Sequence, residues 1–324
     1  MKTEHASQLD RVSTTKLTWE EVRDDSPSSD ISPLCISFLQ KAEIPRANAI
    51  YELEFEDRGD LLVYAVKTVG LVKINLRITI HAAELPLSHS FWNALINFAK
   101  QEKATSLILE VLGQKETDIP HIENGTHRQK AKVYVLDLRK PNSISSNHRR
   151  NIKKAKKNGV YRIEQPLSEA IESHLLVSQE SGARRQTRGE HVAHLPERQR
   201  LIELFSGTRP AKIAQAAMNG KVVSSMLIVF LDNYAFFNSA GSSPDGMSIG
   251  ASHYLMSEVI DELRAQGIKA FNLGLGTTSR SGLAQYKAGF GADEYFFETI
   301  SVDTSSFPRK VAIKASEALQ LFRN

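Results

Sequence analysis

The sequence has 324 residues but one cysteine, Cys35, so an internal disulfide framework is excluded. This is typical of a reducing compartment, and we expect a cytoplasmic protein. The longest apolar run, Met226 to Leu231, falls far short of the ~20 residues that span a bilayer. The N-terminus, MKTEHASQLDRVS, has no apolar stretch of the kind found in signal peptides. We therefore expect no membrane span and no signal peptide.

Three common site motifs are also missing. The sequence has no G-x-S-x-G nucleophile elbow. Gly274-x-Gly276 follows an expected strand, but the third glycine of a dinucleotide-binding turn is absent. His121 and His127 lie near each other without the spacing of metal ligands. These patterns predict neither a Rossmann site nor a metal site, and they fit chemistry that needs no covalent intermediate.

Basic residues slightly outnumber acidic ones, 41 to 37, which permits an anionic partner without requiring one. The charge is dense in NHRRNIKKAKKNGV, at 147–160, where Ser145 or Ser146 can cap a helix. Arg150 and Lys154 lie one turn apart there, and like charges at this spacing repel. Two interpretations remain: a solvated helix face, or a surface for the phosphates of a tRNA, a nucleotide-linked acceptor or coenzyme A.

The order of expected elements predicts an α+β protein. Residues 1–45 are interpreted as a mobile leader followed by a short helix at 33–42. Residues 46–140 alternate strands with one helix, and their third strand, 71–80, has an alternating apolar face. Residues 141–304 form a second half, and 305–324 a terminal helix. Within the second half, a polar loop at 182–196 holds basic side chains that either bind a substrate or are ordinary loop charges: Arg184, Arg185, Arg188 and His191.

The stretch 238–290 has the most informative pattern. A strand ending near Ala240 leads into a glycine-bearing turn, and a helix over 249–266 follows, with Gly267 placed to end it. A strand at 268–273 and a short helix at 282–288 complete the stretch. Small residues begin the long helix, namely Gly250, Ala251 and Ser252, and unpaired amides at a helix start can bind phosphate. Capping alone also explains such residues.

This stretch resembles the Fem-like branch of the GNAT (acyl-CoA N-acyltransferase) superfamily, which includes peptidoglycan-bridge aminoacyl transferases. The similar segments are NSAGSSP, GASHYLMSEVIDELRAQG, FNLGLG and GLAQYKAGFGAD, together with the basic segment at 147–160. The resemblance covers the C-terminal half well, 46–140 only in element order, and 1–45 not at all. It implies two tandem GNAT-like halves, each a mixed, mostly antiparallel sheet flanked by helices, with the donor site in the second half.

The resemblance also implies site residues. Lys287 corresponds to a lysine beside the reacting centre, where a cation can stabilise developing negative charge. Tyr286 and Tyr254 are candidates to protonate the leaving group, although buried aromatic side chains are usually structural. The donor phosphates are assigned to Gly250, Ala251, Ser252, Arg150 and Lys154, and the donor or acceptor cleft to Asn238, Ser239, Gly241, Asn272 and Gly274. A general base is not identified among Asp245, Glu258 and Asp293.

The expected activity is N-acyl transfer by direct attack of a small-molecule or peptide amine on an activated carbonyl. Positioning and hydrogen-bond donors for the oxyanion supply most of such catalysis. Acyl-CoA is slightly favoured as the donor because the GNAT superfamily uses it. Aminoacyl-tRNA is the alternative, favoured by the Fem resemblance and the basic helix. A second alternative is a non-catalytic relative that binds RNA or acts as a scaffold.

Overall fold

The computed structural model describes residues 12–17, 47–55, 58–69, 73–81, 89–113, 127–141, 143–189, 197–206, 210–231, 233–276, 282–306, 308–311 and 313. These residues form two compact units. Unit 1 is Met1–Ala131 with Phe296–Asn324, and unit 2 is Lys132–Tyr295. The sequence assigned 296–304 to the second half. Strand pairing with the first part of the chain instead places Phe296–Asp303 in unit 1.

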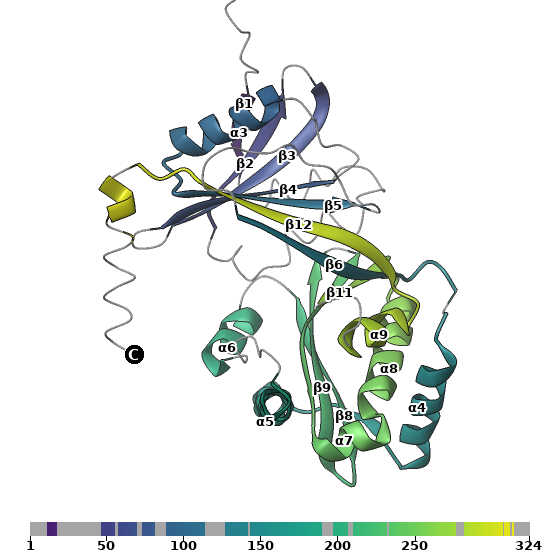
Figure 1. Ribbon diagram of the computed structural model, residues 1–324. Coiled ribbons are helices and arrows are strands. Elements are labelled where there is room, and N and C mark those ends of the chain that lie inside the picture. The colour runs from purple at the N-terminus through teal and green to yellow at the C-terminus, as the bar shows by residue number, and fades with distance from the viewer. Residues whose placement is uncertain are drawn as a thin grey trace, which may run out of the picture. The chain divides into compact units, whose positions relative to one another are not determined.

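In its described part, unit 1 contains a sheet with helix α3 packed against it (Figure 1). Along the sheet the strands are ordered β1-β2-β3-β4-β5-β12, antiparallel except for β4 with β5. The elements are β1 (Val12–Leu17), β2 (Ala47–Phe55), β3 (Arg58–Val69), β4 (Ile74–His81), α3 (His89–Gln101), β5 (Ser106–Gly113) and β12 (Asp293–Asp303).

The core of unit 1 lies between this sheet and α3. The alternation predicted for the third strand is confirmed in β4, where Ile74, Leu76 and Ile78 are buried. Phe91, Leu95 and Phe98 recur on one face of α3 and pack against them. One part of the predicted mobile leader is ordered: Val12–Leu17 forms β1, which pairs with β2. The helix predicted at 33–42 lies outside the described residues, as does most of the terminal helix.

Unit 2 contains the remaining elements. Its strands are ordered β6-β11-β10-β9-β8-β7, and within this order only β10 and β11 run parallel. The elements are β6 (His127–Asp137, in unit 2 from Lys132), α4 (Ser146–Lys157), β7 (Tyr161–Ile163), α5 (Leu167–Thr187), α6 (Arg198–Ser206), β8 (Ala211–Met218), β9 (Lys221–Leu231), β10 (Tyr234–Ser242), α7 (Pro244–Ile249), α8 (Ala251–Ala265), β11 (Ala270–Gly276) and α9 (Gly282–Ala288).

Helices cover both faces of this sheet (Figure 1). Met226 and Ile228 of β9 point into the core shared with α8, whereas Leu227 between them contacts the core shared with α5 and α6. Successive residues of a strand face opposite sides, so this continuous apolar run is that of a strand buried on both faces. We call the two faces of this sheet the α5 face and the α8 face, after the helices that cover them.

Two predicted boundaries change in unit 2. Helix α5 continues through Thr187, so the expected loop at 182–196 is wrong in its first part, and Arg184 and Arg185 are helical. Packing on the sheet explains the extension, because Gly182 is buried and the guanidinium of Arg184 donates to the Ser242 carbonyl at 3.1 Å. The expected helix over 249–266 is α8 preceded by the separate short helix α7. The Ser243 hydroxyl caps α7 by accepting from the Gly246 amide.

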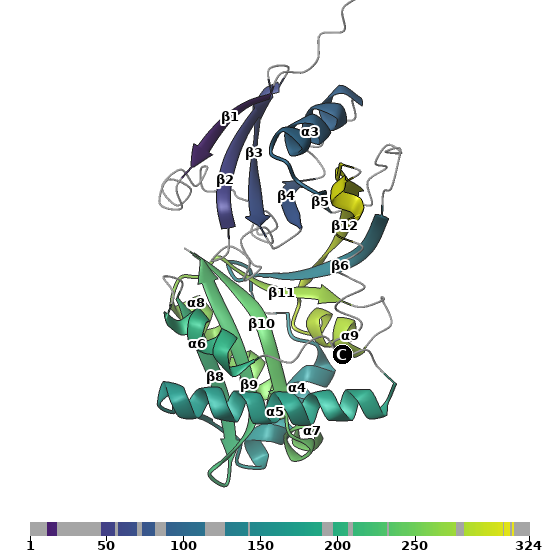
Figure 2. The ribbon, with the colours of Figure 1, turned by 90° about the vertical axis from the view of Figure 1, so that its left-hand side faces the viewer.

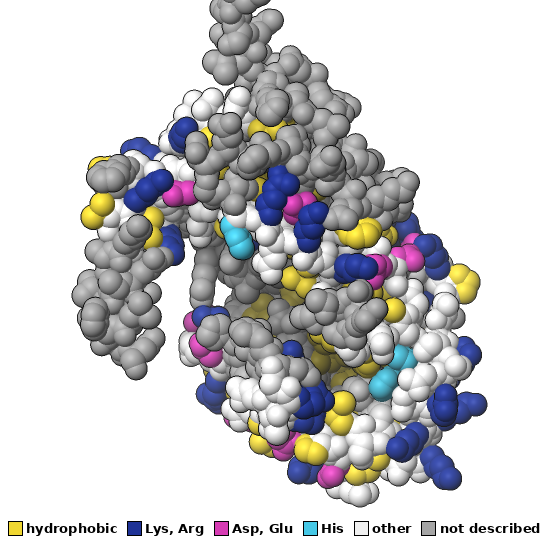
Figure 3. All heavy atoms as spheres, in the orientation of Figure 1, with side chains coloured by type: hydrophobic (Ala, Val, Ile, Leu, Met, Phe, Trp, Pro, Cys, Tyr) yellow, Lys and Arg dark blue, Asp and Glu magenta, His cyan; other side chains and the backbone are white. Residues whose placement is uncertain are grey.

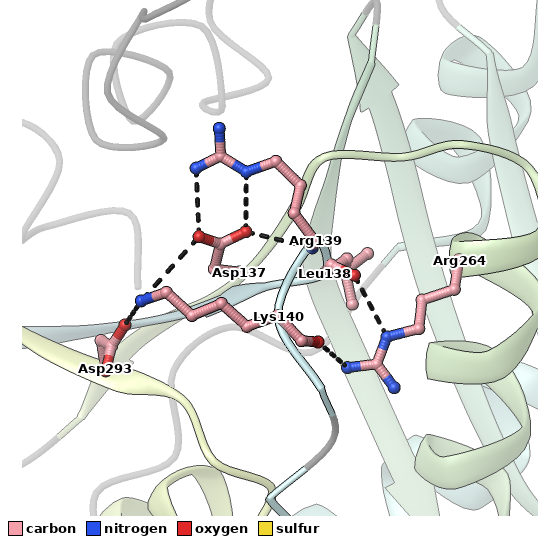
Figure 4. A network of polar contacts seen from close by, with 6 residues as sticks. All are labelled: Asp137, Leu138, Arg139, Lys140, Arg264 and Asp293. Atoms are coloured by element: carbon pink, nitrogen blue, oxygen red, sulfur yellow. Dashed lines mark hydrogen bonds and ion pairs between the residues drawn. The ribbon is translucent and has the colours of Figure 1, made fainter.

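The turn after β6 is held by charged side chains (Figure 4). The guanidinium of Arg264, at the end of α8, donates to the carbonyls of Leu138 and Lys140 at 3.2 and 3.1 Å. Asp137 accepts two bonds from the Arg139 side chain, and the Lys140 amine lies 3.2 Å from a carboxylate oxygen of Asp293. Helix α4 begins soon after this turn, so these contacts fix its starting point against α8.

Candidate active site

The parallel strands β10 and β11 pair over only three residues. Tyr234–Phe236 face Ala270–Asn272, and over the described lengths of both strands their pairing goes no further. Register shifts follow at once, between Phe237 and Ser239 in β10 and between Asn272 and Gly274 in β11. Figure 2 shows the two strands running apart. We call residues 237–240 and 273–275 the strand fork; along its facing edges the two strands no longer pair with each other.

Lys287 of α9 reaches this fork. Its Nζ donates to the Leu275 carbonyl at 2.8 Å and lies 6.0 Å from the centre of the Phe237 ring. A Cβ placed on Gly274 would be 3.8 Å from the same nitrogen. The Lys287 side chain therefore touches both strands of the fork from the α8 face. It is 4% exposed, which is rare for lysine.

Burial determines the charge of Lys287. Removing an ammonium from water disfavours the charged form, and this lowers the pKa of Lys287 from 10.5 to about 7. Near neutral pH the amine therefore exists in both protonation states. A group with such a pKa can take a proton from one reactant and return it to another.

Asn272 supplies a hydrogen-bond donor beside the fork. Its Oδ1 accepts from the Gly274 amide at 2.7 Å, which assigns the other side-chain atom as the NH2 group. The residue is 2% exposed, and its Nδ2 has no partner among the described residues. A buried donor without a partner destabilises a protein by about 1–3 kcal/mol. An acceptor on a bound ligand would remove this penalty.

The cleft residues expected on β10 differ in their surroundings. Asn238 is exposed and lies at the register shift. Ser239 is partly exposed, and its Oγ lies 3.0 Å from Nε2 of His174 on α5. Gly241 packs against α5, since a Cβ there would come within 2.4 Å of the Val177 carbonyl oxygen. Thus Asn238 and Ser239 border the fork, whereas Gly241 allows a helix to approach the strand.

Sequence reasoning missed His174, which is fully buried. Its Nδ1 lies 2.9 Å from Ser225 Oγ, so both ring nitrogens contact a hydroxyl. Burial lowers the pKa of His174 to about 4. The only signal in the sequence is its position in the apolar stripe of α5 between Ile171 and Val177, and buried structural histidines share that pattern.

The start of α8 is packed against its neighbours. Gly250 has a φ of 80° and ends α7 where α8 begins, and a Cβ there would lie 2.7 Å from the Asn151 carbonyl oxygen. Ala251 is fully buried, and the Ser252 carbonyl accepts a 2.9 Å bond from the Tyr286 hydroxyl. The phosphate-binding role of Gly250, Ala251 and Ser252 stays a prediction.

Tyr286 belongs to an aromatic cluster with His148, His253 and Phe290. Ring centres in this cluster lie 4.6 to 6.2 Å apart, and His148 Nε2 lies 2.9 Å from the Tyr286 carbonyl oxygen. Burial raises the pKa of Tyr286. Because the hydroxyl of Tyr286 already donates to a backbone carbonyl, its geometry favours positioning Lys287, the next residue, over proton donation.

Tyr254 does not join this group in any described contact. Its ring lies 5.6 Å from Lys156 Nζ on α4, and burial raises its pKa. The side chains that the sequence associated with the reaction are thus separated into three places. Lys287, Asn272, Gly274 and Ser239 lie at or beside the fork, Tyr286 packs from α9 against His148 and His253, and Tyr254 faces α4.

Helix α4 carries the basic surface. Ser145 caps it as predicted, accepting from the His148 amide, and its outer side chains gather as a blue patch in Figure 3. Lys156 pairs with Glu258 at 3.2 Å, and Lys154 donates to the Ser248 carbonyl at 2.6 Å. The exposed cations of the helix are Arg149, Arg150, Lys153, Lys154, Lys156 and Lys157. This surface suits a phosphate-bearing partner.

Two further features concern ligands and membranes. Among the described residues, no three His, Cys, Asp or Glu side chains come together as a metal site. In the same part of the chain, no helix has the length and apolarity needed to cross a membrane.

Residues 142–288 match the model of a family described as an acetyltransferase (GNAT) domain. No curated protein sequence matches the chain. Among solved structures, FemX is 10% identical, with 88% of this chain and 96% of FemX covered and a TM-score of 0.57. A GCN5-related N-acetyltransferase from Sphaerobacter thermophilus is 11% identical, with 92% and 97% covered and a TM-score of 0.51.

A third solved structure, a conserved protein of unknown function from Bacteroides thetaiotaomicron, is 14% identical, with 90% of this chain and 99% of that chain covered and a TM-score of 0.56. At these identities the likeness shows a shared fold. The matched segment 142–288 contains α4, the strand fork and Lys287. The tandem arrangement of two GNAT-like halves stays a prediction.

Proposed function

We propose that this chain, an acyltransferase with a GNAT domain at residues 142–288, moves an acyl group from a phosphate-bearing activated donor to an amine. The observation that carries the proposal is the buried amine of Lys287, placed where β10 and β11 separate. Amide-bond formation from an activated acyl group requires positioning and proton transfer more than covalent catalysis.

Lys287 can both accept and donate the proton that is transferred in this reaction. Its neutral form accepts a proton from the attacking amine nitrogen as the new C–N bond forms. The resulting ammonium then stabilises negative charge on the carbonyl oxygen and protonates the leaving group as its bond to carbon breaks. A pKa of about 7 suits both steps, because the two forms are nearly equal in free energy at neutral pH.

Asn272 is proposed to donate to an acceptor atom of the donor, such as its carbonyl oxygen. The Nδ2 group is buried and lacks a partner, while the bond from the Gly274 amide to Oδ1 holds the side chain in place. A donor that is fixed before the reaction stabilises developing charge without reorganisation. Asn238, Gly274 and the rest of the fork form the proposed surface for the reacting groups.

The donor is proposed to be an acyl-CoA, because the GNAT fold generally binds this class of molecule and residues 142–288 match the acetyltransferase domain. Aminoacyl-tRNA is the second candidate. The six exposed cations of α4 favour it, since a long phosphate backbone can contact several of them together. Arg150 and Lys154 are the residues proposed to contact donor phosphate. Both donors are cytoplasmic molecules, so the proposed reaction takes place in the cytoplasm.

Turnover separates these candidates. The purified protein is incubated with a panel of amines and with either acetyl-CoA or charged tRNA, and release of free thiol or deacylated tRNA is measured. Lys287→Met, which keeps the aliphatic volume, is expected to lower turnover by ~100-fold. Lys221→Met, at an exposed lysine outside α4 and the fork, is the matched control and should leave turnover unchanged. Consumption of neither donor would favour the non-catalytic, RNA-binding or scaffold alternative, and an unchanged Lys287→Met rate would remove Lys287 from the site.

A further inference from the structure

A chain of three polar side chains crosses from α5 to the fork. His174 lies between Ser225 of β9 and Ser239 of β10, with nitrogen-to-oxygen distances of 2.9 and 3.0 Å. Ser225 and His174 are fully buried, whereas Ser239 is partly exposed. The chain therefore begins inside the sheet–helix interface and ends at a side chain that a ligand can reach.

Close packing sets this alignment. Val177 of α5 touches β10 at Gly241, where any Cβ would collide with the helix backbone. His174 lies one helical turn before Val177, and Ser239 lies two residues before Gly241 on the same face of the strand. The glycine contact thus brings the imidazole onto the Ser239 hydroxyl. Ser225 is the register partner of Gly241 on β9, which places it on the other side of the ring.

The chemistry of the chain is that of neutral groups. Burial lowers the pKa of His174 to about 4, so the ring is neutral at physiological pH, with one nitrogen donating and the other accepting. Forming an imidazolium here is unfavourable, because both neighbours are neutral hydroxyls. This argues against His174 as the base for a serine nucleophile, which would have to hold the serine proton. With the Ser225 hydroxyl donating to Nδ1, the Nε2–H group donates to Ser239 Oγ and leaves the serine proton directed at a ligand.

Ser239 is well placed to contact the acyl donor. It lies beyond Phe236, the last residue of β10 that pairs with β11, and directly after the register shift. Phe236 and Ser239 face α5, whereas Lys287 approaches from the α8 face. A ligand held between the diverging strands would therefore have the lysine amine on one side and the serine hydroxyl on the other.

We propose that the Ser239 hydroxyl donates a hydrogen bond to the acyl donor in the strand fork, and that His174, anchored by Ser225, is the positioning residue that orients it. The proposal rests on the proposed function, because it takes the fork as the donor site. It assigns a recognition role to the α5 face that is separate from the proton transfer by Lys287.

Two substitutions at position 174 test the positioning role. The terminal amide of glutamine reaches the place of Nε2, so His174→Gln can keep the contact with Ser239. The shorter asparagine reaches only the place of Nδ1, so His174→Asn keeps Ser225 and loses Ser239. Ser239→Ala removes the hydroxyl itself. Ser178→Ala is the control, since Ser178 lies one turn further along α5 and its buried Oγ has no partner among the described residues.

Binding is measured with donors that cannot react: an acetyl-CoA analogue with methylene in place of the thioester sulfur, and an amide-linked aminoacyl-tRNA. For whichever analogue the wild type binds, Ser239→Ala and His174→Asn should each weaken binding about tenfold. Their combination should be no worse than either alone, because both remove the same contact. His174→Gln should retain most of the affinity, and thermal denaturation confirms that each variant is folded.

The outcomes separate this proposal from the proposed function. Wild-type binding without turnover would defeat the transferase function while the Ser239 assignment stands. Equal binding by wild type and Ser239→Ala would overturn the Ser239 assignment, whatever the turnover. Equal losses in His174→Gln and His174→Asn would show a packing role for His174. An acyl group found on Ser239 by mass spectrometry would show that Ser239 is a nucleophile and would overturn its role as a hydrogen-bond donor. If the wild type binds neither analogue, both proposals fail.

Discussion

The Nζ of Lys287 lies 2.8 Å from the carbonyl oxygen of Leu275, so a buried amine rests on a neutral acceptor at the edge of β11. Desolvation is the cause of its lowered pKa. A negative charge that develops on a ligand nearby would raise that pKa and draw a proton onto the amine. The protonation state of Lys287 is therefore tied to what occupies the fork.

The activity should rise with pH through about 7. Lys287 must be neutral to accept a proton, and the pKa of about 7 places the loss of activity below that value. The measurement is kcat against pH, with an acceptor whose amine stays unprotonated throughout the assay. A Lys287→Arg variant, permanently charged, should be as inactive as Lys287→Met. A pH-independent rate would show that Lys287 does not act as the base.

Protein stability should also depend on Lys287. Between pH 7 and 10.5 the unfolded state binds more protons at this residue than the folded state, so the free energy of unfolding rises with pH over that window. Below about pH 7 both states are protonated, and the full penalty for the buried charge remains. Urea denaturation of Lys287→Met should therefore show a smaller rise from pH 7 to 10 than wild type. Exposed Lys153→Met should keep the wild-type rise.

The two glycines that bound α8 should respond differently to substitution by alanine. Gly250 and Gly267 have φ values of 80° and 76°, and each alanine would be strained by roughly 1–2 kcal/mol. At Gly250 the new methyl group would also collide with the Asn151 carbonyl, whereas at Gly267 nothing lies within 4 Å. Gly250→Ala should destabilise the protein by roughly 1–3 kcal/mol more than Gly267→Ala. Equal destabilisation by the two variants in thermal denaturation would mean that α4 moves away from the new methyl group without a measurable cost.

Charges on α4 should govern binding of an RNA-linked donor. Arg150→Ala with Lys154→Ala removes two exposed cations, and affinity for tRNA should fall most at low salt because fewer counterions are released. Lys100→Ala with Lys221→Ala, likewise exposed, is the charge-matched control. The slope of log affinity against log salt should become shallower by about 2 in the first pair alone. An identical slope in both pairs would assign α4 to the solvated-face interpretation.

Local sequence patterns predicted much of unit 2. The Ser145 cap, the basic face of α4 and the apolar stripe of α8 depend on residues within a few positions of one another. The Asn219-Gly220 pair is another local signal of this kind, since both residues have the positive φ that a two-residue hairpin turn requires. Lys287 was assigned to the site by resemblance to a family, and its burial was not predictable from a seven-residue helix.

The missing parts of the site depend on contacts between distant segments. His174 matters because Gly241, far along the chain, lets α5 approach β10. The start of α8 is packed because Asn151 of α4 lies against it. Composition and periodicity contain no information on the close contact of α5 with β10 or of α4 with the start of α8. The unexpected length of α5 has the same origin, since its final turns are supported by the sheet and not by helix propensity alone.

The contact between Lys132 and Glu294 has a consequence for how the chain is built. These residues lie at the two limits of unit 2, and their side chains form an ion pair. The polypeptide thus enters and leaves this unit at neighbouring points, as an inserted module does. Because these two ends lie side by side, a short linker could join them in a circular permutant of this unit.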